Sequence, residues 1–159
     1  MEQKTKVSAE EGKQELVITR VFELPVELLF KAYVEPDIVE QWMGTKVVKL
    51  ESKKHGSYQF ETTDAKGNKH GFNGVIHEFS PNQKITRTFE MENTPASAVR
   101  FPIQLEFLEF ENLTDNTSKL NMKIVYKTVA DRDLMLKLPF AQGINQAHNR
   151  LQSIVSKLN

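Results

Sequence analysis

The sequence contains no cysteine, no long apolar run and no excess of charge of either sign. The lack of cysteine excludes disulfides, thiolate nucleophiles and cysteine-based zinc sites. No apolar run approaches the ~18 residues of a membrane-spanning helix, and the first residues, MEQKTKVSAEEGKQE, lack the apolar segment of a signal peptide. Lysine and arginine total 21, as do aspartate and glutamate, so no net positive charge favours binding to nucleic acid. We therefore expect a cytoplasmic protein without a membrane span.

The length and the apolar content predict one folded domain. The chain has 159 residues, of which 39% are hydrophobic and ten are phenylalanine, and this is enough to bury a sizeable core. Residues 1–13 are polar, and we expect them to form a frayed tail. Residues 14–159 then form a single domain, since no internal repeat or linker interrupts them.

Two short helices are predicted between a first strand and the remaining strands. The segment ELVITRVF at residues 15–22 is β-branched and apolar, which favours a strand. Pro25 suits the first turn of a helix, because the N–H that proline lacks has no partner there. A second helix begins at Pro36, carries Trp42 on its apolar face and ends at Gly44.

The middle of the chain predicts antiparallel strands joined by short polar turns. In the last of them Leu120, Met122, Ile124 and Tyr126 alternate without a break, which is the clearest strand signal in the sequence. Asn93–Arg100 is predicted to be a loop. The predicted strand segments are TKVVKLE, SYQFETT, GFNGVIHEFS, KITRTFEME, FPIQLEFLEFEN and KLNMKIVYK.

The C-terminal segment predicts one long amphipathic helix, preceded by a short one near Asp131 and Asp133. Counting from Pro139 gives about twenty residues, or ~30 Å of helix. Helices at both ends of a set of antiparallel strands predict the α+β class. A twisted sheet that curls around the long helix leaves a space between them. We expect the two short helices to close a hydrophobic cavity there. The apolar face of the long helix comprises Phe140, Ile144, Ala147, Leu151, Ile154 and Leu158.

The segment ITRVFELPVELLFKAYVEPDIVEQWMG closely resembles the N-terminal signature of the family named for homology to the activator of the heat-shock-protein-90 ATPase. The segment DAKGNKHGFNGVIHEFSPNQKITRTF is similar to the central hairpin of that family, and the resemblance spans Leu16 to Leu158. The family belongs to the START-like, birch-allergen-like (SRPBCC) superfamily. The resemblance thus implies a helix-grip fold, in which a curved antiparallel sheet wraps around a long C-terminal helix. It also suggests binding of lipids or other hydrophobic ligands and a link to the stress response.

Two positions depart from the pattern of this family. The family often has Trp-Trp-Gly-Pro where this chain has Trp42-Met43-Gly44-Thr45, and often has Gly-Trp where this chain has Gly143-Ile144. Both replacements keep apolar character, so the inferred fold stands. They would reshape a cavity, and a ligand of a relative therefore need not fit this chain.

Few polar side chains stand out as candidates for chemistry. No two histidines have the i, i+4 spacing of a metal site with an accompanying carboxylate, and we expect no metal and no cofactor. His148 flanks the apolar face of the last helix, so it either lies at the boundary of the core or projects into the cavity. Arg20 and Arg87 each stand within an apolar strand. A buried guanidinium needs a partner, so each faces solvent or pairs with a carboxylate, and Arg87 alternatively binds an acidic group of a ligand.

Strand alternation and helical spacing point several large side chains inward, where they line a cavity or fill the core. Carboxylates on the strands, such as Glu106 and Glu109, are expected mostly to face solvent. The predicted ligand-binding residues are Trp42, Met43, Phe60, Phe72, Arg87, Phe89, Phe107, Met122, Phe140, Ile144 and His148.

The leading hypothesis is the binding of a small hydrophobic or amphipathic molecule between the sheet and the C-terminal helix, without catalysis. The resemblance implies two alternatives. One is a protein-interaction module that serves a chaperone ATPase. The other is an enzyme, such as a cyclase or hydrolase of an apolar substrate, for which His148 and Arg87 are the candidate polar groups. Both a monomer and a homodimer are compatible with the sequence.

Overall fold

The computed structural model describes residues 4–92 and 102–158, and it confirms the predicted α+β class. In this part of the chain eight strands form one antiparallel sheet, in the order β1-β2-β8-β7-β6-β5-β4-β3. The predicted loop Asn93–Arg100 lies outside the described residues. The strands are β1 (Lys6–Ser8), β2 (Glu15–Phe22), β3 (Lys46–Leu50), β4 (Ser57–Thr63), β5 (Lys69–Ser80), β6 (Lys84–Met91), β7 (Gln104–Thr114) and β8 (Thr117–Tyr126). The helices are α1 (Val26–Val34), α2 (Pro36–Met43), α3 (Val129–Leu136) and α4 (Phe140–Ser156).

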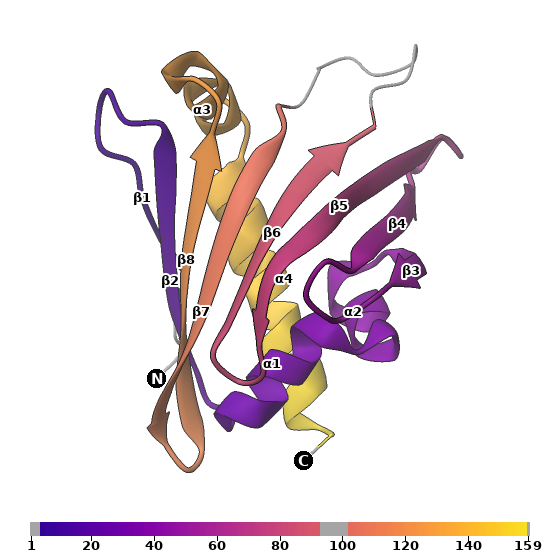
Figure 1. The fold of residues 1–159 in the computed structure, drawn as a ribbon, viewed down its shortest axis with the longest axis vertical. Helices are drawn as coiled ribbons and strands as arrows, with labels where there is room; N and C mark the ends of the chain where they lie inside the picture. The colour runs from indigo at the N-terminus through magenta and orange to yellow at the C-terminus, as the bar shows by residue number, and fades with distance from the viewer. Residues whose placement is uncertain (1–3, 93–101, 159) are drawn as a thin grey trace.

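The long helix α4 runs behind the sheet, as Figure 1 shows, and the core lies between the two. Leu151 and Val155 of α4 are fully buried, and their four-residue spacing places them on one face of the helix. The facing side of the sheet is made by alternate residues of each strand. In β7 and β8, for example, Leu108 lies opposite Met122, and both side chains are buried. This arrangement is the helix-grip fold that the resemblance implied.

The helices α1 and α2 lie together across one end of the sheet, next to α4 (Figure 1). As predicted, α2 begins at Pro36 and ends at Gly44, which adopts the left-handed conformation with φ of 65°. The indole N–H of Trp42 donates a hydrogen bond to the carbonyl oxygen of Ala32 at 2.6 Å. Arg150 of α4 donates to the carbonyl oxygen of Trp42 at 3.1 Å. These contacts fasten the two short helices to each other and to the long helix.

The ends of the chain differ from the sequence-based expectation. The expectation of a frayed N-terminal tail is wrong for Lys6–Ser8, because this segment forms β1 and pairs with β2. The last helix has 17 residues rather than about twenty, and it begins at Phe140, one residue after Pro139. The short helix expected near Asp131 is α3, and the hydroxyl of Thr128 caps it by accepting from the Asp131 N–H. Among the described helices, none is long and apolar enough to span a membrane.

Candidate functional site

A cavity of about 210 Å³ lies where the inner face of the sheet meets α3 and α4, so the expectation that the two short helices α1 and α2 close the cavity is wrong for this one. Its wall is apolar apart from one amide, that of Gln104 at the start of β7. The ring of Phe72 in β5 packs against that of the lining residue Phe89, with ring centroids 5.4 Å apart, but Phe72 does not itself line the cavity. The lining residues are Phe89, Met91, Pro102, Gln104, Met135 and Phe140.

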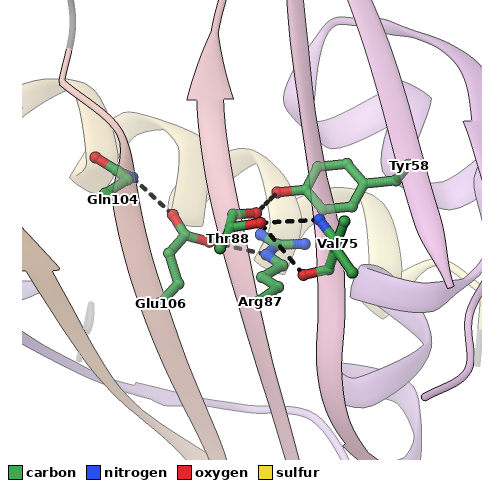
Figure 2. A network of polar contacts seen from close by, with 6 residues as sticks. All are labelled: Tyr58, Val75, Arg87, Thr88, Gln104 and Glu106. Carbon is green, nitrogen blue, oxygen red and sulfur yellow. Dashed lines mark hydrogen bonds and ion pairs between the residues drawn. The ribbon is translucent and has the colours of Figure 1, made fainter. Parts of the chain in front are cut away.

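A buried chain of polar side chains begins at Gln104 and continues through Glu106 to Arg87 (Figure 2). The Gln104 amide nitrogen donates to Glu106 Oε2 at 2.8 Å, and Arg87 Nε donates to Glu106 Oε1 at 2.8 Å. The side chains of Arg87 and Glu106 are only 7% and 5% exposed, so this is a buried ion pair. Both oxygens of the carboxylate are therefore engaged, and the charge of the guanidinium is balanced inside the fold.

Two tyrosine rings flank the guanidinium of Arg87. Its central carbon lies 5.4 Å from the centroid of the Tyr58 ring and 5.9 Å from that of Tyr33, within the range of a cation–π interaction. Burial, the largest single effect, would lower the pKa of Arg87, but the charge and hydrogen bond of Glu106 together with Tyr58 and Tyr33 outweigh it, and the net pKa is raised. Burial likewise raises the pKa of both tyrosine hydroxyls, against the opposing effect of Arg87. At neutral pH the guanidinium is charged and both hydroxyls are protonated.

The position of the Tyr58 ring depends on a glycine in the neighbouring strand. Tyr58 lies opposite Gly74, and its hydroxyl reaches over β5 to donate to the carbonyl oxygen of Thr88 in β6 (Figure 2). A Cβ atom at residue 74 would lie 2.6 Å from the tyrosine oxygen and closer still to the Thr88 carbonyl. Only glycine permits this approach, and the approach holds the ring against Arg87.

A third tyrosine lies beside the same polar chain. Tyr126 pairs with Gln104 in the β7–β8 register and is 2% exposed. Its hydroxyl has no hydrogen-bond partner in the described part of the chain. Burial raises its pKa, and the negative charge of Glu106 adds to this effect, so the hydroxyl remains protonated. It is a buried donor without an acceptor, which is rare in proteins.

His148 belongs to a separate polar cluster, away from the cavity. Its Nδ1 atom lies 2.7 Å from the hydroxyl oxygen of Thr5, the residue before β1. Arg20 Nη1 donates to the same hydroxyl oxygen and to Asn145 Oδ1, both at 3.3 Å. Burial, together with the positive charge of Arg20, lowers the pKa of His148 to about 3. The imidazole is therefore neutral at pH 7, and it joins α4 to the N-terminal segment.

The structure brings together four of the predicted ligand-binding residues, namely Phe72, Arg87, Phe89 and Phe140, at or beside the cavity. Three others, Trp42, Phe60 and Met122, are buried in the packed core, while Met43 and Ile144 are half-buried against it. His148 lies in the Thr5 cluster.

The prediction that Phe107 faces inward is wrong. Glu106 and Leu108 on either side of it are buried against the core, so Phe107 projects from the opposite face of β7. There it lines two hollows of about 250 and 600 Å³. The first is shared with Val17 and Lys123, and the second with Ile103 and Val125.

Sequence reasoning missed two polar residues of the site. It expected carboxylates such as Glu106 mostly to face solvent, and it did not consider Gln104. The strand segment QLEFLEF holds two apolar sets in opposite phase, because Leu105 and Phe107 alternate with Glu106 whereas Leu108 and Phe110 alternate with Glu109. Pairing with β8, whose inward residues are unambiguous, selects Leu108 and hence Glu106 as inward. That cross-strand comparison was the signal available in the sequence. Among the described residues no group of three or more His, Asp and Glu side chains could hold a metal ion.

Comparisons with known proteins agree with the fold. A family model described as activator of Hsp90 ATPase homolog 1-like protein matches residues 23–156. A crystal structure from Rhodobacter sphaeroides has a TM-score of 0.83 at 18% identity, covering 97% of this chain and 99% of its own. A solution structure from Arthrobacter aurescens has a TM-score of 0.84 at 13% identity, with 96% and 91% covered. A crystal structure from Chromobacterium violaceum has a TM-score of 0.71 at 21% identity, with 89% and 97% covered. No curated protein sequence matches the chain.

Proposed function

We propose that this chain, which belongs to the family of activator of Hsp90 ATPase homolog 1-like proteins, binds a small apolar or amphipathic molecule between its sheet and its C-terminal helix. The observation that supports this most is the cavity of about 210 Å³. It combines an apolar wall with a single amide, Gln104, and this amide leads to the buried Arg87–Glu106 pair. An apolar pocket with a few convergent polar groups is typical of small-molecule sites.

Binding without catalysis fits the state of the polar groups. His148, the strongest candidate for a general base, has its Nδ1 atom next to the Thr5 hydroxyl, and its pKa is lowered to about 3. A base with so low a pKa accepts protons poorly at pH 7. Arg87 is held by Glu106, so its role at the site is to offer hydrogen bonds rather than to transfer a proton.

Isothermal titration calorimetry with butylbenzene, a neutral apolar molecule with one ring that suits a cavity of this size, tests this proposal. We expect saturable binding at one site and displacement by any molecule that copurifies with the protein and appears as added mass in native mass spectrometry. Met135→Lys places a charge in the cavity wall and should weaken butylbenzene binding about tenfold or more. The matched control is Leu136→Lys, because Leu136 is the next residue of α3 and is 41% exposed. Equal binding by the two variants would contradict the proposed location, and absence of saturable binding would contradict the function.

The outer face of the sheet favours a second candidate, the binding of another protein. Phe107 lines both hollows on this face, and the neighbouring Ile103 is 55% exposed. The family description names an activator of the Hsp90 ATPase, and an apolar patch on a sheet suits such a partner. If so, adding this protein should raise the ATPase rate of an Hsp90-type chaperone, and Phe107→Ser should abolish the increase. An unchanged rate at high concentration of the wild-type protein would exclude this candidate.

A further inference from the structure

We propose that the interior site selects molecules that carry a neutral hydrogen-bond acceptor, such as a ketone, ester or amide carbonyl, over molecules that end in a carboxylate. This inference rests on the proposed ligand-binding function and names the chemical class of its ligand. It follows from the hydrogen-bonding state of Arg87 and Tyr126 and from the charge of Glu106.

The buried polar groups beside the cavity supply more donors than acceptors. In the described part of the chain the hydrogen bond of Arg87 to Glu106 uses Nε alone, which leaves the two terminal NH₂ groups of the guanidinium with no hydrogen bond. The hydroxyl of Tyr126 is a further buried donor without a partner there. Each oxygen of Glu106 already accepts one hydrogen bond, from Arg87 or from Gln104. A ligand that satisfies the Tyr126 hydroxyl must therefore contribute an acceptor, since a buried donor left without one is costly.

The register of β6 and β7 places Arg87 one inward pair away from Phe89 and Gln104, which line the cavity. Phe89 lines the cavity and lies opposite Gln104, and the next inward pair along the same two strands is Arg87 and Glu106. Two residues along a strand span ~7 Å. An acceptor two or three bonds beyond an apolar ring that rests against Phe89 would therefore approach the guanidinium. The cavity of about 210 Å³ lies below the ~300–1,000 Å³ of sites for drug-sized molecules, which favours a ligand with one ring.

Charge balance decides which acceptor is preferred. Glu106 already neutralises Arg87, so a ligand carboxylate would bring a second negative charge next to the first in a buried site. The rings of Tyr33 and Tyr58, which flank the guanidinium, also present their negative faces to this region. A carboxylate would lose its hydration without an uncompensated cation to bind, whereas a carbonyl loses far less on burial.

Three probes that share a phenylethyl body separate these possibilities. 4-Phenylbutan-2-one has a neutral carbonyl, 3-phenylpropanoate has a carboxylate at the same position, and butylbenzene has no acceptor. Affinities for the wild-type protein are measured at pH 7.5 by isothermal titration calorimetry with each probe. We expect the ketone to bind about tenfold more tightly than the carboxylate and severalfold more tightly than butylbenzene. If the probes bind but the carboxylate or butylbenzene binds as tightly as the ketone, the inference is overturned and the proposed function stands. If no probe binds, both are overturned.

A substitution of Glu106 tests the charge argument directly. Glu106→Gln keeps the shape of the side chain but leaves the charge of Arg87 without its carboxylate, so the preference should reverse in favour of 3-phenylpropanoate. The matched control is Glu109→Gln, because Glu109 is exposed on the opposite face of the same strand and should leave the preference unchanged. Unchanged preference in a folded Glu106→Gln protein would overturn the inference. If that variant does not fold, the comparison of the three probes on the wild-type protein still decides it.

Discussion

The buried imidazole of His148 should make the stability of the protein depend on pH in a way that one substitution removes. In the folded protein burial and the charge of Arg20 hold its pKa at about 3, whereas the ordinary value is 6.5. Arg20 is the charged side chain that contacts the cluster, and the other contacts, Thr5 and Asn145, do not titrate. Replacing the imidazole by the neutral amide of His148→Gln keeps a hydrogen-bonding group beside Thr5 but removes the titration.

The sign and the size of the effect follow from proton linkage. Between pH 6.5 and about 3 the unfolded chain binds a proton at His148 and the folded chain does not. The contribution is therefore fully present above pH 6.5 and is lost as the pH falls, at ~1.4 kcal/mol per pH unit. Lowering the pH from about 7.5 to 4.5 should cost the wild-type protein about 2.7 kcal/mol of unfolding free energy that the His148→Gln protein does not lose.

Urea denaturation at a series of pH values measures this effect. The quantity of interest is the difference in unfolding free energy between the wild-type protein and the variant, because effects of other titrating groups cancel in it. His77→Gln is the control, since the His77 side chain is exposed on β5, and its curve should run parallel to that of the wild-type protein. A difference between the wild-type and His148→Gln proteins that stays constant from pH 7 to pH 4.5 would refute the assignment of His148 as a buried neutral group.

Three further predictions concern the sheet and the site, and urea denaturation at pH 7 checks each of them. Gly74→Ala should lower the unfolding free energy by about 2–4 kcal/mol, because the new Cβ collides with the Tyr58 hydroxyl and the Thr88 carbonyl. Gly143→Ala is the contrasting change: residue 143 lies in open space within α4, and the substitution should raise the unfolding free energy by about 0.5–1 kcal/mol. Glu106→Leu should cost about 3–5 kcal/mol by leaving a buried charge alone, and adding Arg87→Met should restore most of the loss. Phe107→Thr should cost about 1 kcal/mol or less, since that ring lies on the outer face. If Phe107→Thr lowered the unfolding free energy by more than about 3 kcal/mol, Phe107 would have to lie in the core.

The elements of this fold were predictable because most of their signals are local. The alternation from Leu120 to Tyr126 and the repeat of apolar residues in the last helix depend only on which side of an element is buried. The end of α2 at Gly44 has an equally local cause, the left-handed conformation that glycine adopts readily. The short strand Lys6–Ser8 carries no such signal, since it is an edge strand with little burial, and its pairing with β2 defines it.

The candidate site was less predictable because its polar members depend on contacts between distant segments. The inward position of Glu106 follows from the register of β7 against β8, and the place of the Tyr58 ring requires a glycine sixteen positions along the chain, at residue 74. His148 occupies one face of α4 close to Ile144, yet its partner is Thr5 at the other end of the chain. Periodicity indicates which side of an element is buried, but it does not indicate which segment covers that side.

The Arg87–Glu106 pair gives the strongest reason to regard this region as a site. Its position in the sheet could be filled by an apolar pair, as Leu108 and Met122 fill the neighbouring one, and such replacements of buried ion pairs are often neutral or stabilising. The fold therefore has no need of the pair for stability. If the double substitution Arg87→Met with Glu106→Leu leaves the protein stable but abolishes the preference for the ketone over butylbenzene, the charges serve ligand recognition. A stable double variant that keeps this preference would assign recognition to Tyr126 or Gln104 instead.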